Sequence, residues 1–261
     1  MGALPAIKNT DNVIRLRIVN GELTKKEAVR YNKDGTIDKR HSNRVAGVSS
    51  EVYPFKSEEE IKAMIDVFNK RIEESTNENQ RMIACRNKML FLIGINIGIR
   101  ASDLVSLRYS FFMNDDGTFK DSYSLQPKKT RRTGKYVKLF FNETVKKAIA
   151  DYIKEYPIQD MDGYLFKSRE GDGYLTAKSL WKIIVNAAND AGIEGNFGTH
   201  SLRKTFGYWA WHNAEDKNKA LVILQKIFNH TDTSTTSKYI GITNDEMSDV
   251  FNSLDLGFDY I

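Results

Sequence analysis

The feature that most constrains this chain is an apolar run that ends beside an arginine. The longest apolar stretch runs from Met89 to Ile97 and is interrupted by Asn96. Gly98 follows directly and suits a left-handed helix end, so we predict a buried helix over about residues 81–97. Arg100 comes two residues later, where burying a lone charge without a partner is costly. Arg100 is therefore a candidate functional residue.

The same apolar run is too short, and too closely flanked by polar residues, to cross a bilayer. The first residues lack the charged-then-apolar pattern of an export signal. Cys85 is the one cysteine and cannot form an internal disulfide, which fits a reducing compartment. We expect a cytoplasmic protein without a membrane partner.

The distribution of charge favours a polyanionic partner. The net charge is +5 and the pI is near 9.0. Residues 120–140 hold seven Lys or Arg against one acidic residue, whereas five acidic and no basic residues follow Tyr239. Such a basic segment is typical of a surface that meets phosphates, although charge runs are more often simply solvated.

Three parts are predicted along the chain. Residues 1–51 are polar and basic, with one short apolar alternation at Val13–Val19, and are expected to form an arm or domain remnant. A compact domain begins near Val52 and runs to residue 240, since Ser57 and Glu60 form a capping box ahead of helical apolar spacing. The acidic tail 241–261 carries an amphipathic stripe, which would pack either on its own domain or on a neighbouring subunit.

The predicted fold is mainly helical with a small antiparallel sheet. A hairpin is expected from strands at 119–125 and 136–141, which flank a basic stretch, and a short strand is expected at 164–166. Besides the helices from Ser57 and over 81–97, further helices are predicted at 102–107, 142–155, 176–191, 201–212, 218–228 and 234–240, with a last one around 247–254.

Two further polar groups stand at predicted helix ends. His200 and Arg203 lie one turn apart on one helical face, next to a helix N-terminus that favours anions. His230 follows an apolar helix, and Tyr239 comes nine residues later. Each of these residues taken alone has a structural explanation that is at least as good.

Read jointly, four blocks of the chain resemble the tyrosine recombinases, also called the phage integrase family. The resemblance runs from about Val52 to Tyr239 and implies that family's catalytic-domain fold. The four blocks, in order, are Gly98–Leu104, Gln126–Thr130, Thr199–Arg203 and Asn229–Tyr239. Their order and spacing make a specific signal that no single block provides.

The resemblance implies a six-residue active site that cuts and rejoins DNA through a 3′-phosphotyrosyl intermediate. The six residues are Arg100, Lys129, His200, Arg203, His230 and Tyr239. The arginines supply charged forks for the non-bridging phosphate oxygens, and the tyrosine is the nucleophile. His200 would shuttle the tyrosine proton, His230 would donate a hydrogen bond to the phosphate, and Lys129 would protonate the leaving 5′ oxygen. Lys135 is the second choice for this last role.

The resemblance also implies double-stranded DNA as partner, a homotetramer on that DNA, and a bacterial or phage-encoded protein associated with the nucleoid. No metal, ATP or other cofactor is expected, because the covalent ester stores the bond energy needed for rejoining. The four histidines and single cysteine also lack zinc-ligand spacing. Residues expected to contact DNA are Lys128, Arg131, Arg132, Lys135 and Lys204.

Two other functions stay open from the sequence. The chain could be a catalytically silent DNA-binding regulator on the same fold, or a relaxing enzyme of the type IB topoisomerase kind. Three features depart from the family pattern: residues 1–51 are few for the usual N-terminal DNA clamp, Asn229 replaces a common glycine, and Asp103 replaces a frequent glutamate.

Overall fold

The computed structural model describes residues 13–19, 22–29, 51–169 and 171–242. The chain divides into two compact units, residues 1–51 and 52–261. In the first unit, β1 (Val13–Val19) pairs antiparallel with β2 (Glu22–Val29), and the register shifts between Arg17 and Ile18. The apolar alternation indicated the first strand, but the charged sequence of the second gave no comparable signal.

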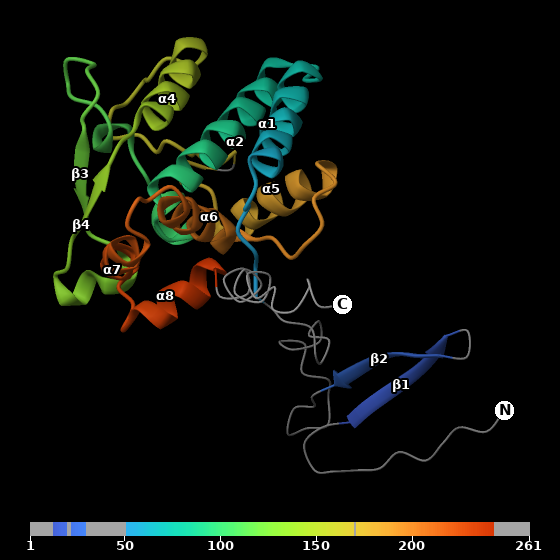
Figure 1. Ribbon diagram of the computed structural model, residues 1–261. Helices are drawn as coiled ribbons and strands as arrows, with labels where there is room; N and C mark the ends of the chain where they lie inside the picture. The colour runs from blue at the N-terminus through green and yellow to red at the C-terminus, as the bar shows by residue number, and fades with distance from the viewer. Residues whose placement is uncertain (1–12, 20–21, 30–50, 170, 243–261) are drawn as a thin grey trace, which may run out of the picture. The chain divides into compact units, whose positions relative to one another are not determined.

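The second unit is mainly helical, as predicted, with one small antiparallel sheet (Figure 1). Its strands β3 (Ser122–Leu125) and β4 (Val137–Phe140) form the predicted hairpin, each shorter than expected. The basic stretch between them folds into a 3-10 turn, η2 (Lys128–Thr133). The helices are α1 (Glu58–Glu73), α2 (Glu78–Ile97), α3 (Ala101–Leu104), α4 (Glu143–Glu155), α5 (Ala177–Asp190), α6 (Thr199–His212), α7 (Lys217–Phe228) and α8 (Thr233–Ile240), with a short 3-10 turn η1 (Tyr109–Phe111).

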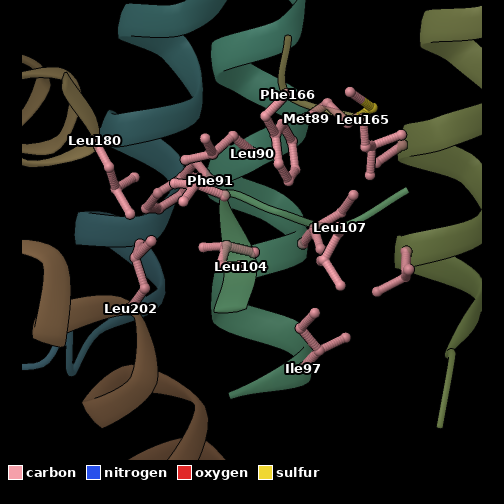
Figure 2. Packing of buried hydrophobic residues seen from close by; sticks show 14 of the residues in the cluster. Met89, Leu90, Phe91, Ile97, Leu104, Leu107, Leu165, Phe166, Leu180 and Leu202 are labelled. Atoms are coloured by element: carbon pink, nitrogen blue, oxygen red, sulfur yellow. The ribbon is translucent and has the colours of Figure 1, made fainter. Parts of the chain in front are cut away.

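Helix α2 is the centre of the main hydrophobic core. Met89, Leu90 and Phe91 are buried on it. In Figure 2, Leu90 and Phe91 lie toward Leu180 and Leu202, and Met89 lies beside Leu165 and Phe166. Contacts on both sides explain why the second half of α2, from Met89 to Ile97, is apolar apart from Asn96. A smaller second cluster joins α6, α7 and α8 around Leu224, Phe228, Ile240 and Ile242.

Capping residues set the bounds of the helices. Ser57 and Glu60 form the predicted capping box, and Asn77 accepts from the Gln80 amide to start α2 three residues earlier than expected. Gly98 ends α2 in the left-handed conformation, with φ 60°. A Cβ on Gly98 would lie 2.1 Å from Phe206 of α6. Both the positive φ and this steric contact therefore disfavour any side chain at this position.

Two predicted elements are wrong in detail. Residues 164–166 do not form a regular strand, because Tyr164 makes only an isolated bridge with Arg108 and the Leu165 amide donates to Leu107 O in a loop. Their apolar character reflects burial of Leu165 and Phe166 in the core. The helix expected over 102–107 is shorter and begins earlier, at Ala101. The helix expected around 247–254 lies outside the described residues. In the part of the chain that the structure describes, no helix is long and apolar enough to cross a bilayer.

Replacing Gly98 by alanine is expected to destabilise the second unit by about 2–5 kcal/mol, from left-handed backbone strain plus overpacking against Phe206. Gly117 is the matched control, because its φ is also positive at 83° but nothing lies within 4 Å of its added Cβ. Gly117→Ala should cost only the backbone part, about 1–2 kcal/mol. Urea unfolding of both variants measures the difference, and equal losses would show that the contact with Phe206 is unimportant.

Candidate active site

Arg203 is a buried arginine held by the ends of two helices. It lies on the first turns of α6 and only 6% of it is exposed. Its Nη1 donates to Gly98 O at 2.6 Å and its Nη2 to Phe228 O at 3.2 Å, and its guanidinium stacks on the Phe228 ring at 4.3 Å. Both carbonyls lie at helix C-terminal ends, where the helix dipole favours a cation. Burial lowers the pKa of Arg203 to about 10, which leaves the guanidinium charged at neutral pH.

Arg100 and Arg203 line the same cavity. It directly follows the Gly98 turn and stands at the N-cap position of α3. Both arginines line a cavity of about 120 Å³, together with Asp103 and Pro127. The cavity lies where the end of α2, the β3–β4 hairpin and α6 meet. Two guanidinium groups distant in sequence therefore converge on one region.

Asp103 connects this region to the basic hairpin. Its side chain is buried, and its Oδ1 accepts a 2.9 Å hydrogen bond from the backbone amide of Lys128. This bond fixes the start of the 3-10 turn η2, on which Lys129 is exposed. The role of Asp103 in anchoring the hairpin was not foreseen, since it depends on a contact across 25 residues.

His200 lies in the first turn of α6 and is exposed. The start of this helix is capped by a hydrogen bond from the Gly198 amide to Ser201 Oγ. The pKa of His200 is lowered, mainly by partial burial and then by the positive charges of its neighbours Arg203, Lys204, Arg100 and Lys129. The imidazole is thereby favoured in its neutral form, which can accept a proton.

Tyr239 lies on α8, near its C-terminal end. Helix α8 begins at Asp232, whose carboxylate accepts from the Thr235 amide at 2.6 Å. Burial raises the pKa of Tyr239, and the charge of Arg203 offsets part of this effect. The phenol ring lies 5.4 Å from the Phe228 ring, on which the Arg203 guanidinium also stacks. Gly207 allows this close approach, because a Cβ there would lie 2.5 Å from Ile240.

His230 lies between α7 and α8. Its Nδ1 is 3.1 Å from Thr236 Oγ1, and its ring centroid is 5.0 Å from that of Tyr239. Burial, followed by the charges of Arg203 and Arg100, lowers the pKa of His230. Asn229, which stands where a glycine is common, adopts the left-handed conformation with φ 55° and so preserves the turn that presents His230. Thr236 is buried and is a further site residue that sequence analysis missed.

Of the residues expected to contact DNA, three are exposed on or beside η2: Arg131, Arg132 and Lys135. Lys128 is also exposed, but its ammonium lies 2.8 Å from Tyr174 Oη and over that ring. Lys204 does not fit a surface contact, because only 4% of it is exposed and its Nζ lies 5.2 Å from the Tyr239 ring centroid. The helix register places it on the inner face of α6, which sequence alone did not resolve.

Among the described residues, no group of three or more His, Cys, Asp or Glu is arranged to hold a metal ion. The site is therefore a cluster of cations around a phenol, which suits an anionic substrate. A match to the phage integrase family extends over residues 55–246. The chain belongs to the phage integrase family.

Curated relatives agree with this membership. The chain is 33% identical to the probable integrase/recombinase YoeC of Bacillus subtilis over 175 residues, which cover 66% of this chain and 88% of YoeC. It is 26% identical to the tyrosine recombinase XerD of Oceanobacillus iheyensis over 171 residues, and 25% identical to XerC of Halalkalibacterium halodurans over 199 residues. These matches cover 66% and 76% of this chain but only 55% and 61% of the two Xer proteins.

Solved structures share the fold. XerH site-specific recombinase bound to palindromic difH substrate, in a post-cleavage complex, aligns with a TM-score of 0.56 and 18% identity over 85% of this chain and 58% of XerH. XerA recombinase aligns with a TM-score of 0.55 and 20% identity over 79% of this chain and 66% of XerA. The mainly helical second unit with its small antiparallel sheet is thus the catalytic-domain fold of tyrosine recombinases, as predicted.

Arg100→Ala is expected to raise the pKa of both His200 and His230, because the charge of Arg100 lowers both. In the native protein both imidazoles should titrate below the ordinary value of about 6.5 and become protonated only as pH falls further. NMR titration of the histidine ring protons measures the midpoints. Arg81→Ala is the control, since Arg81 pairs with Glu155 and contributes to neither histidine. Unchanged titration midpoints of His200 and His230 in Arg100→Ala would mean that the Arg100 side chain points away from both histidines.

Proposed function

We propose that this integrase-family protein is a site-specific DNA recombinase that cuts and rejoins strands through a covalent bond to Tyr239. The observation that supports this most directly is that Tyr239 and Arg203 pack against the same Phe228 ring, while Arg100 lines the same cavity as Arg203. A phosphodiester bound there would meet its nucleophile and two fixed cations together. This arrangement is what attack on phosphorus needs, because negative charge grows on the non-bridging oxygens.

The chemistry balances without an outside energy source. Tyr239 Oη forms a bond to phosphorus, the bond from phosphorus to the 5′ oxygen breaks, and the phenolic proton passes to a base. His200 suits that role in its neutral form, and Lys129 supplies a proton to the departing 5′ oxygen. The phosphotyrosyl ester keeps the bond energy, so a 5′ hydroxyl can reverse the step without ATP or a metal ion. His230 donates to the phosphate, oriented by Thr236.

Double-stranded DNA is the proposed partner. Arg131, Arg132 and Lys135 form an exposed basic surface beside the cavity, and the aligned XerH structure is described as bound to its difH substrate. Long cationic side chains on a hairpin suit contacts with the phosphate backbone. We further propose that exchange takes place in a homotetramer, in the bacterial nucleoid or on a phage genome.

Tyr239→Phe should abolish the covalent protein–DNA adduct, because the ring stays but the attacking oxygen is gone. The assay uses a nicked duplex carrying the native genomic junction, on which the cut strand cannot be resealed. Wild type should give an adduct that survives denaturation, whereas Tyr239→Phe should bind the same duplex without forming one. An adduct from the Phe variant, or none from wild type, would favour a silent DNA-binding regulator or another nucleophile.

Lys129→Ala is expected to slow cleavage by about 100-fold or more, because the leaving 5′ oxygen then departs without a proton donor. Replacing that oxygen with sulfur should restore the rate, since a thiol pKa of about 8.5 lets the thiolate leave unprotonated. Lys135→Ala is the matched control on the same hairpin and should be affected only through DNA affinity. The reverse pattern would assign the acid to Lys135.

A further inference from the structure

A short segment at the start of the second unit contacts both helices that carry the candidate site. We call residues 52–57 the entry strap. The Phe55 amide donates to Thr205 Oγ1 of α6 at 2.8 Å, and Trp209 Nε1 of α6 donates to Phe55 O at 3.0 Å. The strap is thereby fixed to the helix that carries His200 and Arg203.

The next residue of the strap reaches the helix of the nucleophile. Lys56 Nζ donates to Gly241 O at 2.7 Å, across 185 residues of sequence. The same ammonium lies 5.3 Å from the centroid of the Tyr208 ring on α6. Gly241 ends α8 in the left-handed conformation and stands two residues after Tyr239. Lys56 therefore lies between the two helices and contacts both.

Helix α8 depends on such contacts for its position. It has eight residues, and isolated helices shorter than about 12 residues are marginal in water. Its placement comes from burial of Ile240 and Ile242, and from polar contacts at its ends. A lysine at a helix C-terminus is stabilising, because the last carbonyls carry partial negative charge. Loss of this contact would free the end of α8 that carries the phenol.

We propose that Lys56 is a positioning residue that holds Tyr239 against Arg203 by fixing the C-terminal end of α8. This inference rests on the proposed function, in which Tyr239 attacks the phosphate. Lys56 acts here through its own contacts with Gly241 O and the Tyr208 ring.

The test measures the rate of covalent adduct formation at saturating DNA for Lys56→Met and Lys56→Arg. We expect Lys56→Met to slow this rate by about 5- to 10-fold, the effect of losing one typical intramolecular hydrogen bond. Lys56→Arg keeps the charge and the reach and should recover most of the rate. Lys62→Met is the matched control, because Lys62 is exposed on the neighbouring helix α1.

Two parallel measurements separate positioning from other roles. DNA affinity, measured for each variant in a Tyr239→Phe background, should match wild type, and thermal melting identifies any variant that fails to fold. A Lys56→Gln variant, which is shorter and polar, replaces Lys56→Met if the latter melts early, and it should show the same rate loss.

Four results would overturn the proposal: an unchanged rate in Lys56→Met, an unchanged rate in its replacement Lys56→Gln, equal losses in Lys56→Met and Lys56→Arg, or a fall in DNA affinity that accounts for the slower reaction. The last would make Lys56 a DNA contact. If wild type itself forms no adduct, the proposed function fails before the role of Lys56 is reached.

Discussion

The site depends on one buried guanidinium. Arg203 extends from α6 into the interior and donates hydrogen bonds to the terminal carbonyls of α2 and α7, and its guanidinium stacks on the Phe228 ring. Burying a charge is costly unless hydrogen bonds and opposite partial charges compensate for lost water, and two helix C-termini supply both. The same bonds hold the ends of α2 and α7 next to α6. Arg100 and His230 each lie two residues beyond one of the two carbonyls.

The proposed nucleophile and the two arginines are held by different sets of contacts. Arg100 follows α2, which fills the main core, whereas α6, which carries Arg203, contributes to both clusters. Tyr239 lies on a short helix in the smaller cluster, fixed through Ile240, Ile242 and the ammonium of Lys56. The position of the proposed attacking group therefore depends on the smaller cluster, and that of Arg100 on the main core.

Much of the fold could be predicted because it follows from local patterns. The capping box at Ser57, the glycine end of α2 and the hairpin around the basic stretch each depend on a few neighbouring residues. The predictions that failed concern residues whose structure or burial depends on contacts with distant parts of the chain. Leu165 and Phe166 are apolar because the core covers them, not because they pair in a strand. Lys204 is basic and adjacent to Arg203, but helix geometry turns it inward under the Tyr239 ring.

By itself, the sequence determined the order of the four motif blocks, the helix ends that present them and the identity of the charged groups. Only the tertiary structure decided which of these groups meet. Arg100 and Arg203 line one cavity, Asp103 anchors the hairpin of Lys129, and Lys56 contacts the end of α8 across 185 residues. The physical reason is the sequence distance over which the interactions act. Helix caps and turns depend on residues a few positions apart, whereas the burial of a charge depends on contacts with distant parts of the chain.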